Sequence, residues 1–305
     1  MKSFKQNRLY RRFVDYMNRH YPVLLAKVRF RLMFGKKFNT KNPRDLNEKI
    51  LWLSLFSDTT EWSRLSDKYA VRDYVAEKGF EDILVPLYGK WDKAEDIDWN
   101  NLPNSFVLKT NNGSGTIIIV KDKKTVDEIE VRQALNDMLS YDNSSSTTEF
   151  HYQRITPCII AEQLIDFSND INKSSSIIDY KIWCLNGTAY YIWVCKNREI
   201  GKGAEVAMFD VNWNYLPEKS IFTDHYREQT TLVRKPDNLK QMLLVAEKLA
   251  EPFPEVRVDL YNINGKIYFG EMTFTSLGGT MNYLSQECLL EMGSKIDLSK
   301  VKKIK

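Results

Sequence analysis

The sequence predicts an α+β protein whose functional site lies between two subdomains. Helical patterns dominate the first part of the chain, and alternating apolar and polar residues, typical of half-buried strands, dominate the remainder. A chain of 305 residues is long enough to form two hydrophobic cores. The clearest pair of strands lies at 255–274, where Asn264-Gly265 marks the turn of a hairpin.

The composition is ordinary for a globular protein, with 43% hydrophobic and 28% charged residues. The sequence contains no run of eighteen or more apolar residues and no charged-then-apolar leader with a small-residue cleavage site. We therefore expect a cytoplasmic protein. The four cysteines have no CxxC spacing, which indicates reduced thiols and argues against a zinc site.

Charge is unevenly distributed, although the formal net charge is only +4. Residues 1–37 contain eleven Lys or Arg and a single acid, Asp15, whereas the remainder holds 33 basic and 39 acidic residues. Two helices are expected in this segment, at 5–20 and 22–34. The segment is either a peripheral contact for anionic lipid or anionic glycan, or a helical cap with a solvated basic face. We expect no nucleic-acid partner.

The patterns divide the chain into four parts. These are a basic helical segment (1–37), a helical or α+β subdomain (38–104), a subdomain with a glycine-rich loop (105–165), and a subdomain with a metal site and the C-terminal tail (166–305). In the second part we expect helices at 42–56 and from Thr59 or Thr60 to Gly79, then a short strand at 83–87 and a polar connection at 92–98.

The later elements alternate between strands and helices. Strands are expected at 106–110 and 117–120, on either side of a glycine-rich turn, followed by a helix at 126–139 and a mobile serine-rich loop at 140–148. Further predictions are a strand at 158–164, a hairpin of 177–185 with 188–196, a strand at 205–211 and a helix at 237–250.

The hairpin at 255–274 carries two acids, Asp259 and Glu271, whose apolar or β-branched neighbours would bury them. A buried carboxylate is costly unless it is paired or bound to a cation, so with Arg257 nearby the pair indicates a hard-metal site that handles phosphates. The alternative is an ordinary hairpin whose acids face water.

The length of the turn decides whether the two acids share a face. A two-residue turn would place Asp259 opposite Gly270 and Glu271 on the other face of the sheet. We predict a three-residue turn with Gly265 as a left-handed bulge. The residues on one face are then Arg257, Asp259, Phe269, Glu271 and Thr273.

Three other stretches carry candidate binding residues. The turn 111–116 joins two strands, so P-loop and dinucleotide-binding interpretations fit poorly, but its backbone N–H groups could fold over a triphosphate with Lys109 as a point charge. Asp179 and Lys181 share one face of a strand, and Glu162 ends a strand whose following backbone could form an adenine hinge. Each has an ordinary alternative: a plain turn, a solvated edge lysine and a surface acid.

Taken in order, these motifs resemble the ATP-grasp superfamily, and more closely its TupA-like branch, named for teichuronopeptide biosynthesis. The phrases that carry the resemblance are NPRDLNEKILWL, LSDKYAVRDYV, FVLKTNNGSG, DYKIWCLNG and RVDLYNINGKIYFGEMTFT, and they cover about residues 38 to 280. The resemblance implies an ATP-grasp fold, in which two α+β subdomains clamp ATP, preceded here by an N-terminal helical segment.

The resemblance also implies roles for single residues. Lys68 and Lys109 would hold the α- and β-phosphates, and Asp179 the ribose. Arg257 would steady the transferred phosphoryl group, and Lys181 occupies a position often filled by Arg. The β- and γ-phosphates would lie under the backbone of Asn112, Gly113, Ser114, Gly115 and Thr116, and the adenine would contact Glu162, Gln163 and Leu164.

Asp259 and Glu271 would bind one or two Mg²⁺ ions. The family's usual Glu-x-Asn ending has Thr273 in place of Asn, so the threonine hydroxyl or a water would replace the amide. The loop 275–280 would form the acceptor-side wall.

The activity that the resemblance implies is that of an ATP- and Mg²⁺-dependent carboxylate–amine ligase acting through an acyl phosphate. It would attach an amino acid or other amine to a uronic-acid carboxylate during biosynthesis of a surface polysaccharide, such as a capsule, O-antigen or teichuronopeptide-like polymer. One alternative is a glycosyltransferase that uses a nucleotide-sugar, with Asp96-Ile97-Asp98 as its metal motif. The other is a non-catalytic carbohydrate-binding protein that uses its 7 Trp and 16 Tyr as stacking surfaces.

Overall fold

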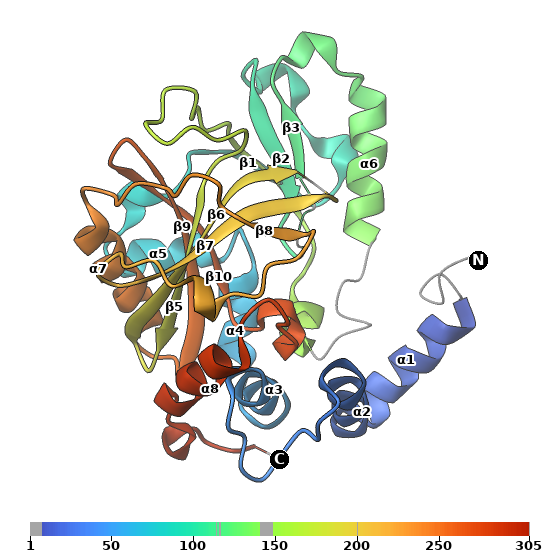
Figure 1. Ribbon diagram of the computed structural model, residues 1–305. Helices are drawn as coiled ribbons and strands as arrows, with labels where there is room; N and C mark the ends of the chain where they lie inside the picture. The colour runs from blue at the N-terminus through green and yellow to red at the C-terminus, as the bar shows by residue number, and fades with distance from the viewer. Residues whose placement is uncertain (1–7, 114, 116, 141–148, 200, 305) are drawn as a thin grey trace.

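The computed structural model describes residues 8–113, 115, 117–140, 149–199 and 201–304, and it confirms the α+β class. Two β-sheets form the body, a four-stranded sheet beside helix α6 and a six-stranded sheet with helices on both faces (Figure 1). The predicted serine-rich loop falls mostly on 141–148, which lies outside the described residues, as do Ser114 and Thr116.

The first two helices agree with the prediction. Helix α1 covers Arg8–His20 and α2 covers Pro22–Phe34. Gly35 ends α2 in a left-handed conformation, with φ of 67°, and donates its N–H to the carbonyl of Arg31. Both helices lie beside the main body of the molecule, near its lower edge in Figure 1.

Helix α3 covers Leu46–Phe56 and begins later than predicted. The predicted start at Asn42 is wrong because Asp45 caps the helix: its carboxylate accepts the N–H of Glu48 at 2.9 Å. A single helix ending at Gly79 is also wrong. The chain forms α4 (Thr60–Ser66) and α5 (Val71–Glu77), separated by a turn in which the Asp67 carboxylate accepts the backbone N–H groups of Tyr69 and Ala70.

The small sheet has the strand order β1-β4-β2-β3 and is antiparallel throughout. Its strands are β1 (Leu87–Trp91), β2 (Phe106–Thr110), β3 (Ile117–Val120) and β4 (Ile159–Gln163). The strand predicted at 83–87 is wrong: that stretch is a 3-10 turn (Glu81–Ile83) followed by Pro86, which cannot donate to a ladder. Helix α6 (Glu128–Ser140) packs Leu135 against Phe106 and Leu108.

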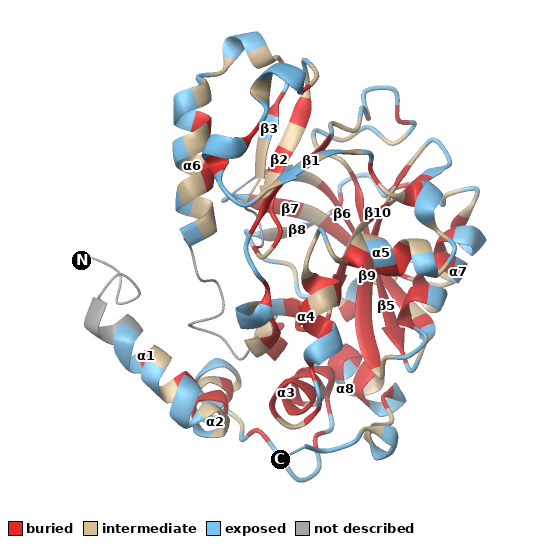
Figure 2. Cartoon of the chain, turned by 180° about the vertical axis from the view of Figure 1, so that it is seen from behind, coloured by how far each residue is buried: buried red, intermediate tan, exposed pale blue. Residues whose placement is uncertain are grey.

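The large sheet has the order β10-β9-β5-β6-β7-β8. Its strands are β5 (Asp179–Leu185), β6 (Thr188–Glu199), β7 (Gly203–Asp210), β8 (Tyr226–Glu228), β9 (Glu255–Ile263) and β10 (Lys266–Thr273). Helix α7 (Leu239–Ala250) packs on one face, and α8 (Gln286–Lys295) packs on the other together with Leu46 and Ile50 of α3. The strands of this sheet are largely buried (Figure 2). Strand β8 and helix α8 were not predicted.

The hairpin β9–β10 corrects the predicted turn. Lys266 pairs with Ile263, so the turn has two residues, and both Asn264 and Gly265 have positive φ, at 49° and 89°. This is the conformation that an Asn-Gly turn favours between twisted strands.

The extra residue lies further along β10, at Gly270, where the register shifts between Phe269 and Glu271. After this bulge Glu271 pairs with Asp259, and Thr273 pairs with Arg257. The two acids therefore share a face, as predicted, but the cause is a bulge within β10 rather than a bulged turn. Phe269 does not share that face: it pairs with Leu260 and belongs to the apolar core on the other side.

Candidate active site

A row of charged side chains crosses three neighbouring strands of the large sheet. Lys181 on β5 is the register partner of Asp259 on β9, which is the partner of Glu271 on β10. The ammonium group of Lys181 donates to the Asp259 carboxylate. Asp259 is 1% exposed, so its charge is almost entirely surrounded by protein.

Arg257 binds the same carboxylate with two guanidinium nitrogens. Its Nε donates to Oδ1 of Asp259 at 2.6 Å, and its Nη2 donates to Oδ2 at 2.8 Å. This fork geometry fixes both groups, because a planar guanidinium matches a carboxylate edge to edge. Further bonds reach the Thr273 hydroxyl at 3.1 Å and the Ser276 hydroxyl at 3.0 Å.

The electrostatics of this row keep Asp259 and Lys181 ionised. Burial raises the pKa of the Asp259 carboxyl, but Arg257 and Lys181 outweigh burial and hold the pKa below its usual value. Burial lowers the pKa of Lys181, and Asp179 with Asp259 more than reverses the change, so its pKa is raised. The site is thus a set of fixed charges at neutral pH.

Glu271 differs from Asp259 in its exposure and its partners. Its side chain is 41% exposed, and Oε1 accepts the Thr273 hydroxyl at 3.1 Å and lies 3.5 Å from Nη2 of Arg257. Glu271 is therefore held in position on one side while its carboxylate remains open to a ligand.

A second group of charges faces this row from the helical turn and the small sheet. Lys68, in the turn between α4 and α5, donates Nζ to the carbonyl of Gly113 at 2.5 Å. Lys109 on β2 pairs with Glu162 on β4 at 2.5 Å, and Arg72 lies 3.3 Å from the same carboxylate. The surrounding protein lowers the pKa of Lys68, against the opposing charge of Glu271.

The glycine-rich turn starts from a rigid base. The Asn111 amide accepts the N–H of Cys158 at 2.7 Å and donates to the carbonyl of Thr156 at 3.0 Å, while its own carbonyl accepts the N–H of Lys68 at 3.1 Å. Asn112 and Gly113 follow directly. The start of the turn is therefore fixed to both β4 and the turn that carries Lys68.

The residues expected to bind the nucleoside lie at the ends of strands. Glu162 is buried, and the N–H of Gln163 donates to the carbonyl of Pro86 at 2.9 Å, whereas the Gln163 side chain is exposed and Leu164 is half-buried. The Asp179 carboxylate accepts Nη2 of Arg198 at 2.7 Å. Arg72 and Arg198 were not predicted as site residues, because nothing in the sequence links either arginine to its distant carboxylate.

The features behind the two alternative functions have structural uses. Asp98 caps the 3-10 turn Trp99–Asn101: its carboxylate accepts the N–H of Asn101, which gives this acid a structural role. The largest aromatic side chains, such as Trp183 and Trp193, are buried at 0% and 2% exposure and cannot stack on a glycan, whereas the exposed aromatic residues include Tyr16, Tyr21, Tyr69 and Tyr88.

The family model described as TupA-like ATPgrasp matches residues 48–297. Among solved structures, D-alanine–D-alanine ligase from Helicobacter pylori is 18% identical with a TM-score of 0.45, over 83% of this chain and 69% of that one. Biotin carboxylase from Campylobacter jejuni is 12% identical with a TM-score of 0.48, over 85% of this chain and 53% of that one. A search of curated proteins gave no match.

The family model covers most of the chain and includes every proposed site residue from Lys68 to Thr273. The two-sheet arrangement is the fold that the sequence resemblance implies, with an N-terminal helical segment before it. The chain therefore belongs to the TupA-like ATP-grasp family.

Proposed function

We propose that this chain is a ligase that joins an amino acid or other amine to a uronic-acid carboxylate during surface-polysaccharide biosynthesis. The family's name, with its link to teichuronopeptide synthesis, supports the carboxylate class. The observation that carries the site is the row Lys181–Asp259–Glu271 on three adjacent strands. The charge of Glu271 also acts on the pKa of Lys68, which is bound to the glycine-rich turn through the carbonyl of Gly113.

In this proposal the nucleotide lies between the two sheets. Lys68 and Lys109 hold the α- and β-phosphates, and the backbone from Asn112 covers the β- and γ-phosphates. Glu162 and the following backbone contact the adenine, and Asp179 holds the ribose. The partners of these groups support the assignment: Glu162 anchors Lys109, and Arg198 orients Asp179.

The donor set at the other end fits Mg²⁺. Glu271 offers an open carboxylate, which is the ligand type that Mg²⁺ prefers, and Thr273 adds a hydroxyl. Both oxygens of Asp259 on the adjacent strand accept bonds from Arg257 or Lys181, so Asp259 would bind the ion only by giving up one of these bonds. Among the described residues no group of three or more His, Cys, Asp or Glu could hold a metal, so waters and phosphate oxygens would complete the coordination. The ion would neutralise charge on the phosphates.

The chemistry has two balanced steps. A carboxylate oxygen of the acceptor attacks the γ-phosphorus, the bond from that phosphorus to the β,γ-bridging oxygen breaks, and ADP leaves. The neutral amine nitrogen then attacks the acyl carbon, the bond from that carbon to the phosphate oxygen breaks, and inorganic phosphate leaves while the nitrogen loses one proton. Arg257, fixed by Asp259, would stabilise the transferred phosphoryl group, and Lys181 would hold Asp259 in place.

The products test this function. The purified chain with ATP and Mg²⁺ is expected to form ADP and phosphate only when both a uronic acid, such as glucuronate, and an amine are supplied. Formation of AMP and pyrophosphate would exclude the acyl-phosphate route.

We also propose that the N-terminal helices contact an anionic membrane surface from the cytoplasmic side. Leu24, Val28 and Leu32 of α2 are 51%, 46% and 82% exposed and lie four residues apart, which places them in one stripe. Lys27 and Arg31 lie beside that stripe, and both are exposed. No helix in the described part of the chain is long and apolar enough to span a bilayer.

Charge and exposure together favour a bilayer. The excess of eleven basic residues over one acid in 1–37 would repel a second copy and attract an anionic surface. Exposed apolar side chains bury no apolar surface against a soluble anionic glycan, whereas they can insert among lipid headgroups. The cap interpretation also holds in part, because Phe30 on the opposite face of α2 is fully buried in the core.

A further inference from the structure

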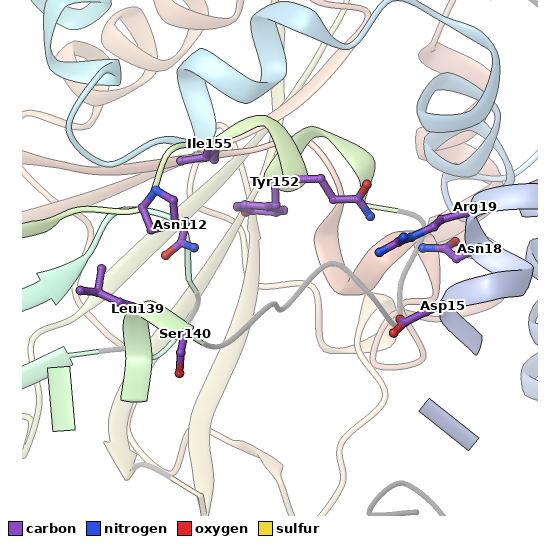
Figure 3. Close-up of a pocket in the computed structure, with 10 residues that line it drawn as sticks. Asp15, Asn18, Arg19, Asn112, Leu139, Ser140, Tyr152 and Ile155 are labelled. Atoms are coloured by element: carbon purple, nitrogen blue, oxygen red, sulfur yellow. The ribbon is translucent and has the colours of Figure 1, made fainter. Parts of the chain in front are cut away.

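A cavity of about 310 Å³ lies between helix α1 and the phosphate end of the site (Figure 3). Asp15, Asn18 and Arg19 point into it from α1. Asn112, at the start of the glycine-rich turn, and Tyr152, in the 3-10 turn Phe150–Arg154, line it from the other side. Its volume is at the lower end of the range for small-molecule sites, so the cavity suits one small substrate molecule better than a polymer segment.

The cavity adjoins the position where the phosphoryl group would be transferred. Asn112 precedes Gly113, whose carbonyl accepts the Lys68 ammonium. Burial raises the pKa of Tyr152, and the charge of Glu271 adds to this effect. The carboxylate of Glu149 accepts the Thr275 hydroxyl at 2.6 Å, which fixes the Tyr152 segment to the loop that follows Thr273.

Helix α1 presents opposite charges to this cavity. Asp15, Asn18 and Arg19 are three and four residues apart and therefore lie on one face of the helix. Within the described part of the chain, neither Asp15 nor Arg19 forms an ion pair with any other residue. An exposed guanidinium and a half-buried carboxylate are thus both available to a ligand.

Resting on the ligase function proposed above, we propose that this cavity binds the amine substrate and that α1 selects an α-amino acid. The Arg19 guanidinium would bind the carboxylate of the amino acid edge to edge, and Asp15 would bind its ammonium group before that nitrogen is deprotonated for attack. The family model begins at residue 48, so this selectivity would reside in a helix outside the matched part of the chain.

The test compares two arginines on the same helix. Arg19→Ala and Arg12→Ala remove the same charge from exposed positions, but only Arg19 lines the cavity. The full chain, saturated with ADP and Mg²⁺, is titrated with each of the twenty common amino acids while its thermal midpoint is recorded. We expect at least one amino acid to stabilise the wild type and Arg12→Ala at similar concentrations, and Arg19→Ala to require about tenfold more or greater.

A second comparison assigns the contact to the carboxylate. The amide of the same amino acid lacks the negative charge, so it should bind the wild type as weakly as the parent amino acid binds Arg19→Ala. The affinity for the amide should not fall further in Arg19→Ala. Asp15→Asn should weaken binding of the parent as well.

Three outcomes would overturn the inference. If ADP and Mg²⁺ stabilise the chain but no amino acid does, the proposed class of amine substrate is wrong while the ligase function survives. If Arg12→Ala weakens binding as much as Arg19→Ala, the effect is general surface charge and the cavity assignment fails. If neither nucleotide nor amino acid stabilises the chain, the proposed function fails and the inference fails with it.

Discussion

At the residue scale, the two acids of the hairpin have different environments although the sequence presents them alike. Asp259 is buried and bound by Arg257 and Lys181, whereas Glu271 is partly exposed and held by a single hydroxyl bond and a longer ion pair. Removing the Asp259 charge would leave two buried cations, Arg257 and Lys181, with only their longer ion pairs to Glu271 and Asp179, which costs stability as well as activity. Glu271 is therefore the better position at which to test the metal site alone.

We expect Glu271→Gln to lower turnover about 100-fold or more while the protein keeps its fold, because the change removes an open ligand charge and little packing. Steady-state ADP formation and the denaturant midpoint measure the two effects. Glu287→Gln is the matched control, since its side chain is 81% exposed and lies on α8 rather than on the hairpin. An equal loss of turnover in both variants, or no loss in either, would place the metal elsewhere.

His151 gives a prediction of pH dependence. It is 1% exposed, and within the described residues its ring nitrogens have no hydrogen-bond partner. Burial, with a smaller contribution from Arg154, lowers its pKa from 6.5 to about 3. The unfolded chain therefore takes up this proton first as the pH falls below 6.5, and the folded state loses stability down to about pH 3.

From pH 7.5 to 5 this group should reduce the free energy of unfolding by about 2 kcal/mol. His151→Phe, which keeps an aromatic ring against Trp62, should remove that part of the pH dependence. Urea unfolding at the two pH values measures it, and the exposed His225→Gln serves as control. If the free energy of unfolding of His151→Phe falls between pH 7.5 and 5 as much as that of the wild type, the account is contradicted.

Sequence could supply the identities of the site residues but not their partners. Lys68, Lys109, Asp179 and Glu271 stand in motifs whose local pattern is readable. Arg72 and Arg198 reach their carboxylates from 90 and 19 residues away, and such pairs depend on how the two sheets are placed. Tyr152 gave no signal either, because an aromatic residue at that spacing is more often part of a core.

At the element scale, one glycine aligns the metal-binding residues. A two-residue turn alone would put Asp259 and Glu271 on opposite faces of the sheet, and the bulge at Gly270 restores them to one face. A Cβ at Gly270 would lie 2.8 Å from the Asp259 carbonyl oxygen, which is closer than real Cβ contacts. The backbone at the bulge thus has no room for a side chain.

We expect Gly270→Ala to reduce turnover by roughly 100-fold, because relief of that contact moves Glu271 relative to Asp259. Gly265→Ala in the turn of the same hairpin is the control. Its φ of 89° makes alanine strained there, at a cost of about 1 kcal/mol in stability, but nothing lies within 4 Å of the added Cβ. If the two variants have equal turnover, the bulge does not position the site.

The errors in predicting elements have local causes. The long helix predicted at 59–79 is interrupted because the Asp67 carboxylate accepts the backbone N–H groups of the two residues after Lys68. This interruption places Lys68 in a turn at the site. The turn was misplaced because an Asn-Gly pair fits both a two-residue and a bulged hairpin, whereas the bulge at Gly270 depends on packing against β9. Strands with clear apolar alternation, such as β2 and β3, were predicted correctly.

At the scale of the whole molecule, the basic N-terminal segment both caps the core and exposes an apolar stripe. Phe30 is buried and Leu32 is 82% exposed on the same helix. Deleting the segment would therefore expose core surface, so substitutions in the stripe test membrane contact more cleanly than truncation does.

The double variant Leu24→Ser/Leu32→Ser should lose co-sedimentation with phosphatidylglycerol vesicles, while turnover on soluble substrates remains at the wild-type level. Wild-type protein should bind these vesicles more strongly than neutral phosphatidylcholine vesicles, and less at high salt. Leu244→Ser, at a 52% exposed position on α7, should behave as wild type. Vesicle binding that survives the double variant would contradict the proposal.

The central claim is that the space between the two sheets binds Mg²⁺-ATP, and nucleotide-dependent thermal stability tests it most directly. ATP at about 100 times its dissociation constant should add about 2.7 kcal/mol and raise the thermal midpoint by about 5 °C, only with Mg²⁺ present. Lys109→Met should lose most of this shift, and Lys121→Met, an exposed lysine just beyond β3, should keep it. A shift with a UDP-sugar and none with ATP would contradict the account.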